Sequence, residues 1–554
     1  MIVTRNFVFE QFSLFVIESL LRLRVRTLPF HGGNTGSSPV GGTCYPFMIN
    51  LTIFSSFLPE IVLCFLGLVQ LIQTVGWARE DNFLLVRYVV SAQTFFILLI
   101  AGYILLYTSV EISTDLFIND LSCYRVKMII VFFSMPLVFI VSHCCKFQKI
   151  NFPEFMSLYL LSIVCLLLLI SANDFLIIYV VLEIQTIISY AMTSMNRRSA
   201  HSTDAGLKYF ILGAIFSCIF VFGGVLIYAE SGTLNLEFLT LLYIFLENVR
   251  TSMLSLDRPF QFVGSVCILS TFFFKFGGAP FFSWIPDVYE GAPMGATIAI
   301  SIVPKISLLW VTSKFMTAFH PILYNCDMIF ASLGCITILV GTGFALHQKR
   351  MKRLLIYSSM TQTGFFFLAL STCSLDGTVA LYLFAIAYLI GTSLLWSVLC
   401  FFYTCEGILA SFLKNADAKW PFYVMKLANF FKPNKILGIL ICGIVFGVAG
   451  MPPSLGFLSK LWVLYSLIQS NLFGVSVCVV ILSGYSYFYY IRIIKVIVFE
   501  CKPKYDTKMP EHPLFSDELI DGYHTMLVVG VLLIFSPMHQ DLYVLYVLLI
   551  TLFH

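Results

Sequence analysis

The sequence from residue 271 to 309 is TFFFKFGGAPFFSWIPDVYEGAPMGATIAISIVPKISLL. Its first part is an apolar run long enough to cross a membrane, and this run contains Lys275. Gly277 and Pro280 follow, and they interrupt a helix because glycine has excess backbone freedom and proline lacks an amide donor. A second apolar run then begins and contains Lys305. The stretch therefore predicts two membrane-spanning segments, the first one broken, each with a lysine inside it.

A lysine at this depth points to ion or proton transfer. A charge at the centre of a bilayer costs about 3 kcal/mol on insertion scales. The free backbone groups of a broken helix are tolerated in a membrane only against protein or water. The alternative is a lysine that extends from a helix end towards the membrane surface. The turn of apolar residues before Lys275 favours the transfer path.

Composition indicates a protein that crosses the membrane many times. The 554 residues are 59% hydrophobic and 11% charged, with a mean hydropathy of +0.92. A soluble domain of this composition has too little polar surface to be solvated. The net charge of +4 gives no indication of nucleic-acid binding, and the sequence has neither a glycine-rich nucleotide fingerprint nor a P-loop. The 16 cysteines are interpreted as small hydrophobic residues of a helix bundle, since the adjacent Cys144 and Cys145 suit neither a usual disulfide nor a zinc site.

Two regions differ in character. Residues 1–47 combine an apolar stretch, the basic residues Arg22, Arg24 and Arg26 and a Gly/Ser/Pro-rich linker, and we expect an appended, poorly ordered extension. It is either a targeting presequence or a segment upstream of a true start at Met48. Residues 48–554 are expected to form the transmembrane helix bundle.

The predicted fold is an all-α polytopic membrane protein with about fourteen spans, counted as apolar runs of about 20 residues. The seventh and twelfth spans carry breaks, and residues 420–432 are expected to form an interfacial helix. The spans are centred in 51–75, 84–108, 126–142, 156–172, 174–195, 207–229, 261–284, 293–318, 321–346, 354–373, 377–404, 435–471, 472–499 and 525–553.

Charge predicts the orientation. Basic residues gather after the odd-numbered spans, as at Arg197 and Lys352, and acidic residues gather after the even-numbered ones, as at Asp120 and Glu230. The positive-inside rule then places the odd ends on the inner side of the membrane.

A carboxylate also lies inside a predicted span. Glu183 is surrounded by apolar residues on both sides, so it must be protonated or find a partner. Lys275 is the expected partner by depth. Such a pair titrates as a coupled unit, as a proton relay requires, whereas the alternative is a static pair that only fixes how the helices pack. Lys208 opens the sixth span, where extension to the surface and function are both plausible.

A second break resembles the first. Gly450 and Pro453 interrupt the twelfth span, and Lys460 follows them inside the membrane. In transporters, paired interrupted segments mark the path and belong to repeats related by inversion.

Several further residues give weak signals. We expect Glu60 to face solvent near a helix end and Asp174 to cap a helix N-terminus. Asp287 and Glu290 are expected in a loop, bonded to turns. The histidines lack metal-ligand spacing.

Five motifs, in order, resemble one family: AGLKYFILGA, FKFGGAPFFSWIPDVYEGAP, SIVPKI, KRLLIYSSM and GMPPSLGFLSKLW. The family is that of subunit 2 of mitochondrial NADH–ubiquinone oxidoreductase, respiratory complex I. The resemblance runs from about Glu60 to the end of the thirteenth span.

The resemblance implies an antiporter-like, proton-translocating subunit with inverted repeats around a hydrated polar axis. It places the family's proton-path residues on Glu183, Lys208, Lys275, Lys305 and Lys460. Where many members have YSSIAHVGY, this chain has YSSMTQTGF, so Gln362 replaces a histidine and cannot titrate. The resemblance also implies that this chain holds no cofactor or metal, with NADH, FMN, iron–sulfur clusters and ubiquinone in other subunits. It implies other membrane-arm subunits and lipids as partners, and location in the mitochondrial inner membrane.

The expected mechanism is a proton transfer driven by redox chemistry elsewhere in the complex. Glu183 holds Lys275 charged at rest; when the pair separates, the proton passes through water to Lys305 and Lys460. Three alternatives remain: a free-standing cation/proton antiporter, a structural spacer whose charges only fix the helices, and a chloroplast relative.

Overall fold

The computed structural model describes residues 55–77, 83–107, 112–148, 152–197, 199–249, 259–319, 326–412, 424 and 435–499. The chain divides into two units, Met1–Leu51 and Thr52–His554, and every described residue belongs to the second. The predicted extension 1–47, the predicted span 525–553 and all but residue 424 of the predicted interfacial helix lie outside the described residues.

Helices make up almost all of the described chain, as predicted. They are α3 (Leu58–Trp77), α4 (Phe83–Tyr107), α5 (Leu121–Gln148), α6 (Phe152–Ser171), α7 (Phe175–Thr193), α8 (Ala200–Ser231), α9 (Leu236–Val249), α10 (Pro259–Phe276), α11 (Trp284–Gly291), α12 (Met294–Ser301), α13 (Pro304–Phe319), α14 (Cys326–His347), α15 (Met351–Ser371), α16 (Leu375–Phe412), α17 (Lys435–Ala449), α18 (Leu455–Gln469) and α19 (Phe473–Val498).

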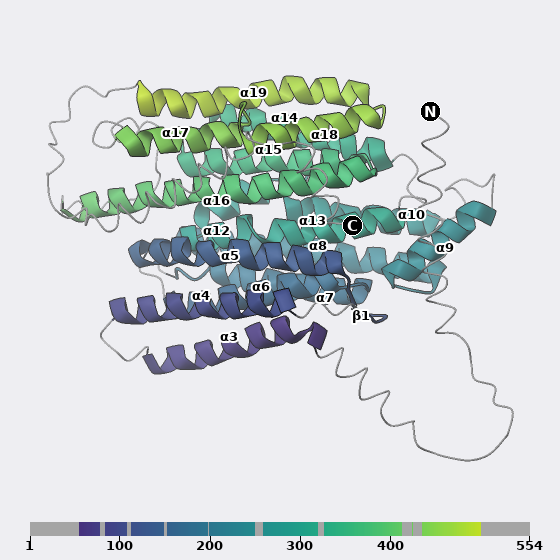
Figure 1. The fold of residues 1–554 in the computed structure, drawn as a ribbon, viewed down its shortest axis with the longest axis horizontal. Coiled ribbons are helices and arrows are strands. Elements are labelled where there is room, and N and C mark those ends of the chain that lie inside the picture. The colour runs from purple at the N-terminus through teal and green to yellow at the C-terminus, as the bar shows by residue number, and fades with distance from the viewer. Residues whose placement is uncertain are drawn as a thin grey trace, which may run out of the picture. The chain divides into compact units, whose positions relative to one another are not determined.

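Eleven stretches of the described residues are long and apolar enough to cross a membrane, and three shorter apolar helices accompany them. The helices lie side by side, with α3 and α4 at one edge of the array and α19 at the other (Figure 1). Every residue of α15 except Arg353 is buried. A helix that is buried around its whole circumference lies in an interior, so α15 forms the centre of the bundle.

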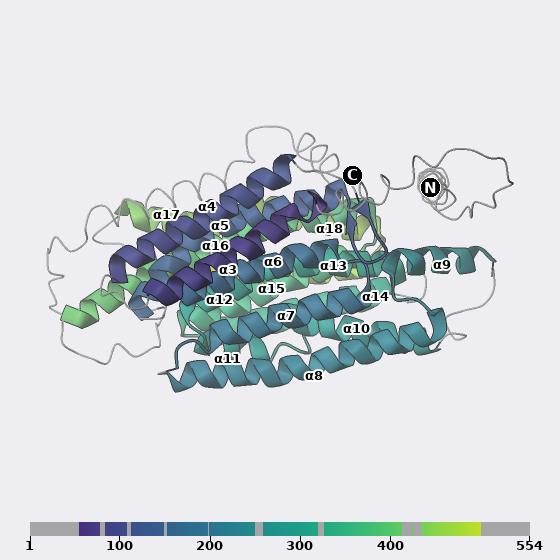
Figure 2. The same cartoon turned by 90° about the horizontal axis from the view of Figure 1, so that it is seen from below.

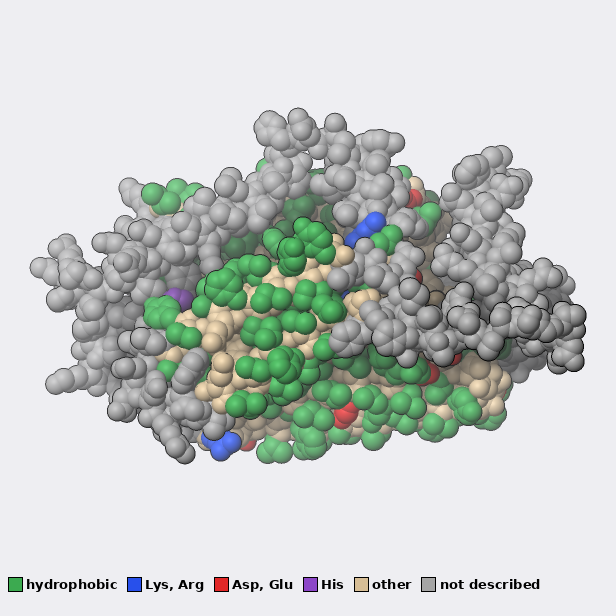
Figure 3. All heavy atoms as spheres, turned by 60° about the horizontal axis from the view of Figure 1, so that its bottom comes forward, with side chains coloured by type: hydrophobic (Ala, Val, Ile, Leu, Met, Phe, Trp, Pro, Cys, Tyr) green, Lys and Arg blue, Asp and Glu red, His purple; other side chains and the backbone are tan. Residues whose placement is uncertain are grey.

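The outward-facing surface is hydrophobic as well. Large apolar side chains such as Ile72 (70% exposed) and Tyr107 (73% exposed) point outward, and hydrophobic side chains dominate the described part of the face in Figure 3. A soluble monomer rarely exposes so much contiguous apolar surface. An apolar environment such as lipid suits it.

Both predicted breaks are confirmed, and they share one backbone feature. Helix α10 ends at Phe276, and Gly277 follows with a φ of +71°. Helix α17 ends at Ala449, and Gly450 follows with a φ of +80°. Only glycine adopts this left-handed conformation without a steric cost. Each break also contains a cis X-Pro bond, at Ala279–Pro280 and at Pro452–Pro453.

The eighth span is interrupted too, which was not predicted. Helix α12 ends at Ser301 and α13 starts at Pro304, so the span is divided at Ile302 and Val303. Pro304 has no amide hydrogen and its ring crowds the carbonyl four residues earlier. The chain therefore bends immediately before Lys305.

Two connecting regions also differ from expectation. The long connection 231–260 contains α9, whose residues Leu236, Leu239 and Tyr243 are buried at helical spacing. The segment expected to be a loop at Asp287 and Glu290 is α11. Short apolar helices of this kind fall below the length that a search for membrane spans detects.

A small β-hairpin pairs Ile112–Ser113 with Ile118–Asn119 in antiparallel register. Phe117 then bridges to Ala172, in the turn before α7, and Asp174 bridges to Asn235, just before α9. We call this the hairpin end of the bundle. The opposite end, where α7 finishes and α8 begins, is the α11 end (Figure 2).

One cysteine interpretation is corrected. The structure joins Cys144 of α5 to Cys400 of α16 in a disulfide, with their Cα atoms 6.2 Å apart. The partner lies 256 positions away in the sequence, so the adjacency of Cys144 and Cys145 gave no information about it. Cys145 is buried, as expected of a small hydrophobic residue.

Candidate functional site

Helix α7 positions Glu183 by a capped start at the hairpin end. Asp174 is its N-cap, as predicted, and its carboxylate accepts a hydrogen bond from the amide of Leu176 at 2.8 Å. Nine residues further along, Glu183 is partly buried and interacts electrostatically with Lys275 at the end of α10. The salt bridges among the described residues do not include this pair. In this conformation the two charges are near each other without direct contact.

Lys275 and Lys305 line the same cavity. Its volume is about 40 Å³, and about 10–15 Å³ suffices for one water molecule. Its polar lining includes Gln185, Ser189 and Ser307, and the buried Oε1 of Gln185 has no hydrogen-bond partner among the described residues. A cavity with this volume and these groups suits water between the two lysines.

Lys305 is 4% exposed. Its Nζ lies 5.2 Å from the centre of the Tyr388 ring, a cation–π distance. The Tyr388 hydroxyl donates a 2.7 Å hydrogen bond to the carbonyl of Ser301, the last residue of α12. The interruption before Pro304 thus provides a backbone acceptor that fixes the ring beneath the ammonium group.

Lys460 lies against the second break. Its Nζ donates a 2.6 Å hydrogen bond to the carbonyl of Ala449, the last residue of α17. The Tyr487 hydroxyl donates to the neighbouring carbonyl of Gly450 at 3.0 Å. The rings of Phe365 and Tyr487 lie 5.4 and 5.5 Å from Nζ. A cation is favoured at a helix C-terminus, where the free carbonyls point outward.

Helix α15 connects the surroundings of Lys305 and Lys460. Phe366 contacts Tyr388, with ring centres 5.4 Å apart, and Phe365 contacts Lys460. Gln362 precedes them by about one turn and therefore lies on the same side of the helix. It is 8% exposed, and its Oε1 is buried without a partner among the described residues. An uncompensated buried amide oxygen is costly, so this position is suited to water.

Lys208 lies apart from this row. Its Nζ forms a 2.8 Å salt bridge with Asp287 of α11, and the two side chains are 56% and 44% exposed. The adjacent residue Tyr209 lines the cavity and stacks on Trp284, with ring centres 4.9 Å apart. Lys208 is thus at the α11 end of the bundle, outside the cavity that Lys275 and Lys305 share.

The contacts that charged residues make at the α11 end were not predicted from the sequence. Glu290 accepts from Arg350 at 2.7 Å and also from Arg353. Lys352 is 2% exposed and donates to the carbonyl of Ala292 at 2.7 Å. Glu290 and its arginine partners are about 60 positions apart in the sequence. The sequence therefore showed that both segments are charged, but not that they pair.

The expectation for Glu60 is wrong. Its carboxylate is 3% exposed and forms a 2.6 Å salt bridge with Lys127, which is 0% exposed. Glu60 occurs in the first turn of α3, but α5 and the hairpin cover it. Lys127 was not singled out, because it lies near the start of its span.

Comparisons with known proteins show which family the chain is similar to. The profile of the family described as "NADH:quinone oxidoreductase/Mrp antiporter, TM" matches residues 172–486. NADH-quinone oxidoreductase subunit N 1 of Rhizobium meliloti is 30% identical over 424 residues, which cover 76% of this chain and 83% of the relative. NADH-ubiquinone oxidoreductase chain 2 of Marchantia polymorpha is 32% identical over 356 residues, which cover 64% of this chain and 69% of the relative.

Solved structures share the fold. A chain of respiratory complex I from Thermus thermophilus superposes with a TM-score of 0.65 and 22% identity, over 86% of this chain and 97% of that one. A chain of the Mrp complex from Dietzia superposes with a TM-score of 0.67 and 14% identity, over 90% of this chain and 100% of that one.

Proposed function

Since the chain belongs to the NADH:quinone oxidoreductase/Mrp antiporter family, as a proton-translocating membrane-arm subunit of NADH–quinone oxidoreductase, we propose that its protons move along the buried row of one glutamate and three lysines described above. The row consists of Glu183, Lys275, Lys305 and Lys460. The observation that carries the proposal is the single cavity shared by Lys275 and Lys305. Redox chemistry elsewhere in the complex supplies the energy.

The first step is the separation of Glu183 from Lys275. A carboxylate close to an ammonium group favours the charged lysine, and separation disfavours it. Lys275 then gives its proton through cavity water to the amine of Lys305. Transfer continues past Tyr388 and Gln362 to Lys460. Each step moves one proton between nitrogen atoms through water, with no change of redox state.

Lys208 is proposed as the entry group. It lies at the α11 end, partly exposed, and the aromatic pair Tyr209 and Trp284 separates it from the cavity. The predicted orientation places this end on the inner side of the membrane. Moving one charge against the membrane potential costs about 2.3 kcal/mol per 100 mV. A change of one unit in a lysine pKa corresponds to about 1.4 kcal/mol, so a change of a few units supplies enough free energy to move the proton.

The similar environments of the two breaks support the inverted repeats that the resemblance implies. Gly277 and Gly450 both take positive φ directly after a helix end, and each break has a lysine close by. Lys275 precedes its break and Lys460 follows the other. An appended N-terminal extension before the bundle remains part of the proposal.

The finer assignment is subunit 2 of the mitochondrial enzyme, in the inner membrane, with other membrane-arm subunits and lipids as partners. The Marchantia chain 2 relative supports it, as do the five motifs. Co-fractionation of the chain with inner-membrane redox subunits tests it, and recovery with thylakoid membranes would favour the chloroplast alternative.

The direct test replaces Lys275 with alanine and, separately, Lys305 with methionine in the assembled complex. We expect the number of protons pumped per electron to fall, since each change interrupts the row. Lys495→Met is the control, because this lysine lies in the last turn of α19. Proton pumping and NADH–quinone reductase activity at the unmodified level in both path variants would reject the proposal and favour a spacer.

A free-standing cation/proton antiporter is the second candidate, favoured by the superposition on a chain of the Mrp complex. The purified chain in liposomes distinguishes the two. Sodium- or potassium-dependent proton movement by the chain alone supports the antiporter, whereas activity that requires the redox subunits supports the proposal.

A further inference from the structure

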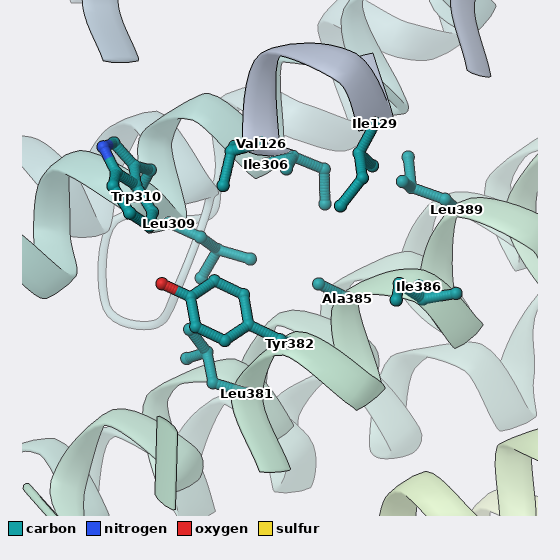
Figure 4. A pocket seen from close by; sticks show the side chains of 10 residues that line it. All are labelled: Val126, Ile129, Ile306, Leu309, Trp310, Leu381, Tyr382, Ala385, Ile386 and Leu389. Carbon is teal, nitrogen blue, oxygen red and sulfur yellow. The ribbon is translucent and has the colours of Figure 1, made fainter. Parts of the chain in front are cut away.

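A second cavity lies along α13 on the hairpin side of Lys305, which does not itself line it. Its volume is about 20 Å³, and α5, α13 and α16 line it. Figure 4 shows the lining side chains, which include Ile306, the residue after Lys305 in the sequence, and Leu389, the residue after Tyr388. At the far side are Trp310 and Tyr382. The cavity therefore follows α13 from the residue after Lys305 towards the hairpin end.

A further lysine lies beyond this cavity. Lys314 is nine positions after Lys305 on α13, about 13 Å along the helix axis at 1.5 Å per residue. Its Nζ donates a 2.9 Å hydrogen bond to the carbonyl of Ile170, near the end of α6. The indole of Trp310 donates to the same carbonyl at 3.1 Å. Two residues after Ile170, Ala172 bridges to the hairpin, so Lys314 lies at the hairpin end.

The lining of this second cavity is apolar. None of the ten described residues that line it is charged, and only Trp310 and Tyr382 carry polar atoms. The indole N–H is already used by Ile170. A buried water needs two to four polar partners, and apolar cavities stay dry. The cavity beside Lys275, in contrast, has amide and hydroxyl groups that can bind water.

We propose that this second cavity is a hydrophobic seal that separates Lys305 from Lys314 and so prevents protons from leaving directly at the hairpin end. The inference rests on the proposed path through Lys305. Without the seal, a continuous file of water would let the ammonium of Lys305 pass its proton to the amine of Lys314 and then to the aqueous side. With the seal dry, the proton must continue to Lys460, so the apolar side chains of the seal set the direction of transfer.

The test introduces polarity into the seal. Leu381 lines it and is 2% exposed. Leu381→Asn supplies two hydrogen-bonding groups and is expected to admit water. Leu399→Asn is the matched control, because Leu399 is on the same helix, is also 2% exposed and does not line the cavity. Ala385 lines the same cavity, and Ala385→Ser is a smaller change. This variant is measured instead if the complex with Leu381→Asn does not assemble.

The measurement is the decay of an imposed pH gradient across vesicles that contain the assembled complex, without NADH. We expect a several-fold faster decay for Leu381→Asn or Ala385→Ser, no change for Leu399→Asn, and return to the unmodified rate when Lys305→Met is added. An unchanged decay, or a faster decay that Lys305→Met does not suppress, overturns the seal. Loss of pumping in Lys305→Met without a leak in the seal variants rejects the seal alone, whereas normal pumping in Lys305→Met rejects the proposed function.

Discussion

Glu60 and Lys127 form a salt bridge inside the bundle, with 2.6 Å between Oε1 and Nζ and almost no exposure of either side chain. Asn119 of the hairpin accepts a second hydrogen bond from the same ammonium group at 2.8 Å. The rings of Phe57 and Tyr124 lie 5.7 Å from it. The pair therefore ties α3, α5 and the hairpin together at one end of the molecule.

Breaking this pair is expected to destabilise the protein strongly. Glu60→Gln leaves a buried ammonium group without its counter-ion, which costs about 3–5 kcal/mol. Replacing both partners with apolar residues, as in Glu60→Leu/Lys127→Met, is expected to cost far less because no charge is left buried. Thermal unfolding of the detergent-purified complex compares the two variants. Equal losses would show that the pair is not the stabilising feature.

The two acidic residues of α11, which form three salt bridges, are expected to contribute differently to stability. Asp287→Asn breaks an exposed pair with Lys208, and exposed pairs contribute about 0–1 kcal/mol. Glu290→Gln removes the counter-ion of both Arg350 and Arg353, and Glu290 is only 17% exposed. We therefore expect Glu290→Gln to lower the unfolding temperature of the assembled complex more than Asp287→Asn does. The reverse order would show that the partly buried acceptor Glu290 does not stabilise α11 more than the exposed Asp287 does.

Gly450 is expected to tolerate no side chain. Its φ of +80° belongs to the left-handed region, and an added Cβ would lie 3.0 Å from Nζ of Lys460. Gly450→Ala should therefore displace Lys460 from the carbonyl of Ala449 and lower the protons pumped per electron. Gly484→Ala in α19 is the control, since an added Cβ meets nothing within 4 Å there. That change should stabilise the helix by about 0.5–1 kcal/mol and leave pumping intact.

The sequence predicts best what depends on local chemistry. Apolar runs located the described spans, and Asp174 was correctly assigned as a cap because an N-cap bond is made within two residues. Gly277 and Gly450 marked the breaks for the same reason. Pro304 carried an equally local signal, but the interruption before it was overlooked because the apolar run continues on both sides.

Long-range partners were beyond the reach of a single sequence. Lys127 is 67 positions from Glu60, and Glu290 meets Arg350 across 60 positions. Nothing in the residue types distinguishes such charges from solvated ones at a helix end. Depth in the membrane alone suggested that Glu183 and Lys275 belong together. The separation of Lys208 from the cavity beside Lys275 depends on the packing of α8 against α11, which no local pattern encodes.

Variants of Gln362 are expected to affect proton pumping and protein stability differently. Its amide oxygen is buried without a partner among the described residues, so Gln362→Leu removes an unsatisfied polar group and is expected to leave the unfolding temperature unchanged or raised. If water at this amide carries protons between Lys305 and Lys460, the same variant should pump fewer protons per electron. Gln362→His keeps a polar group of similar size and adds one that titrates, so it should preserve pumping. Both quantities are measured on assembled complexes with equal NADH–quinone reductase activity. For Gln362→Leu, we therefore expect fewer protons pumped per electron without a lower unfolding temperature. Normal pumping by Gln362→Leu would mean that protons pass between the two lysines without this side chain.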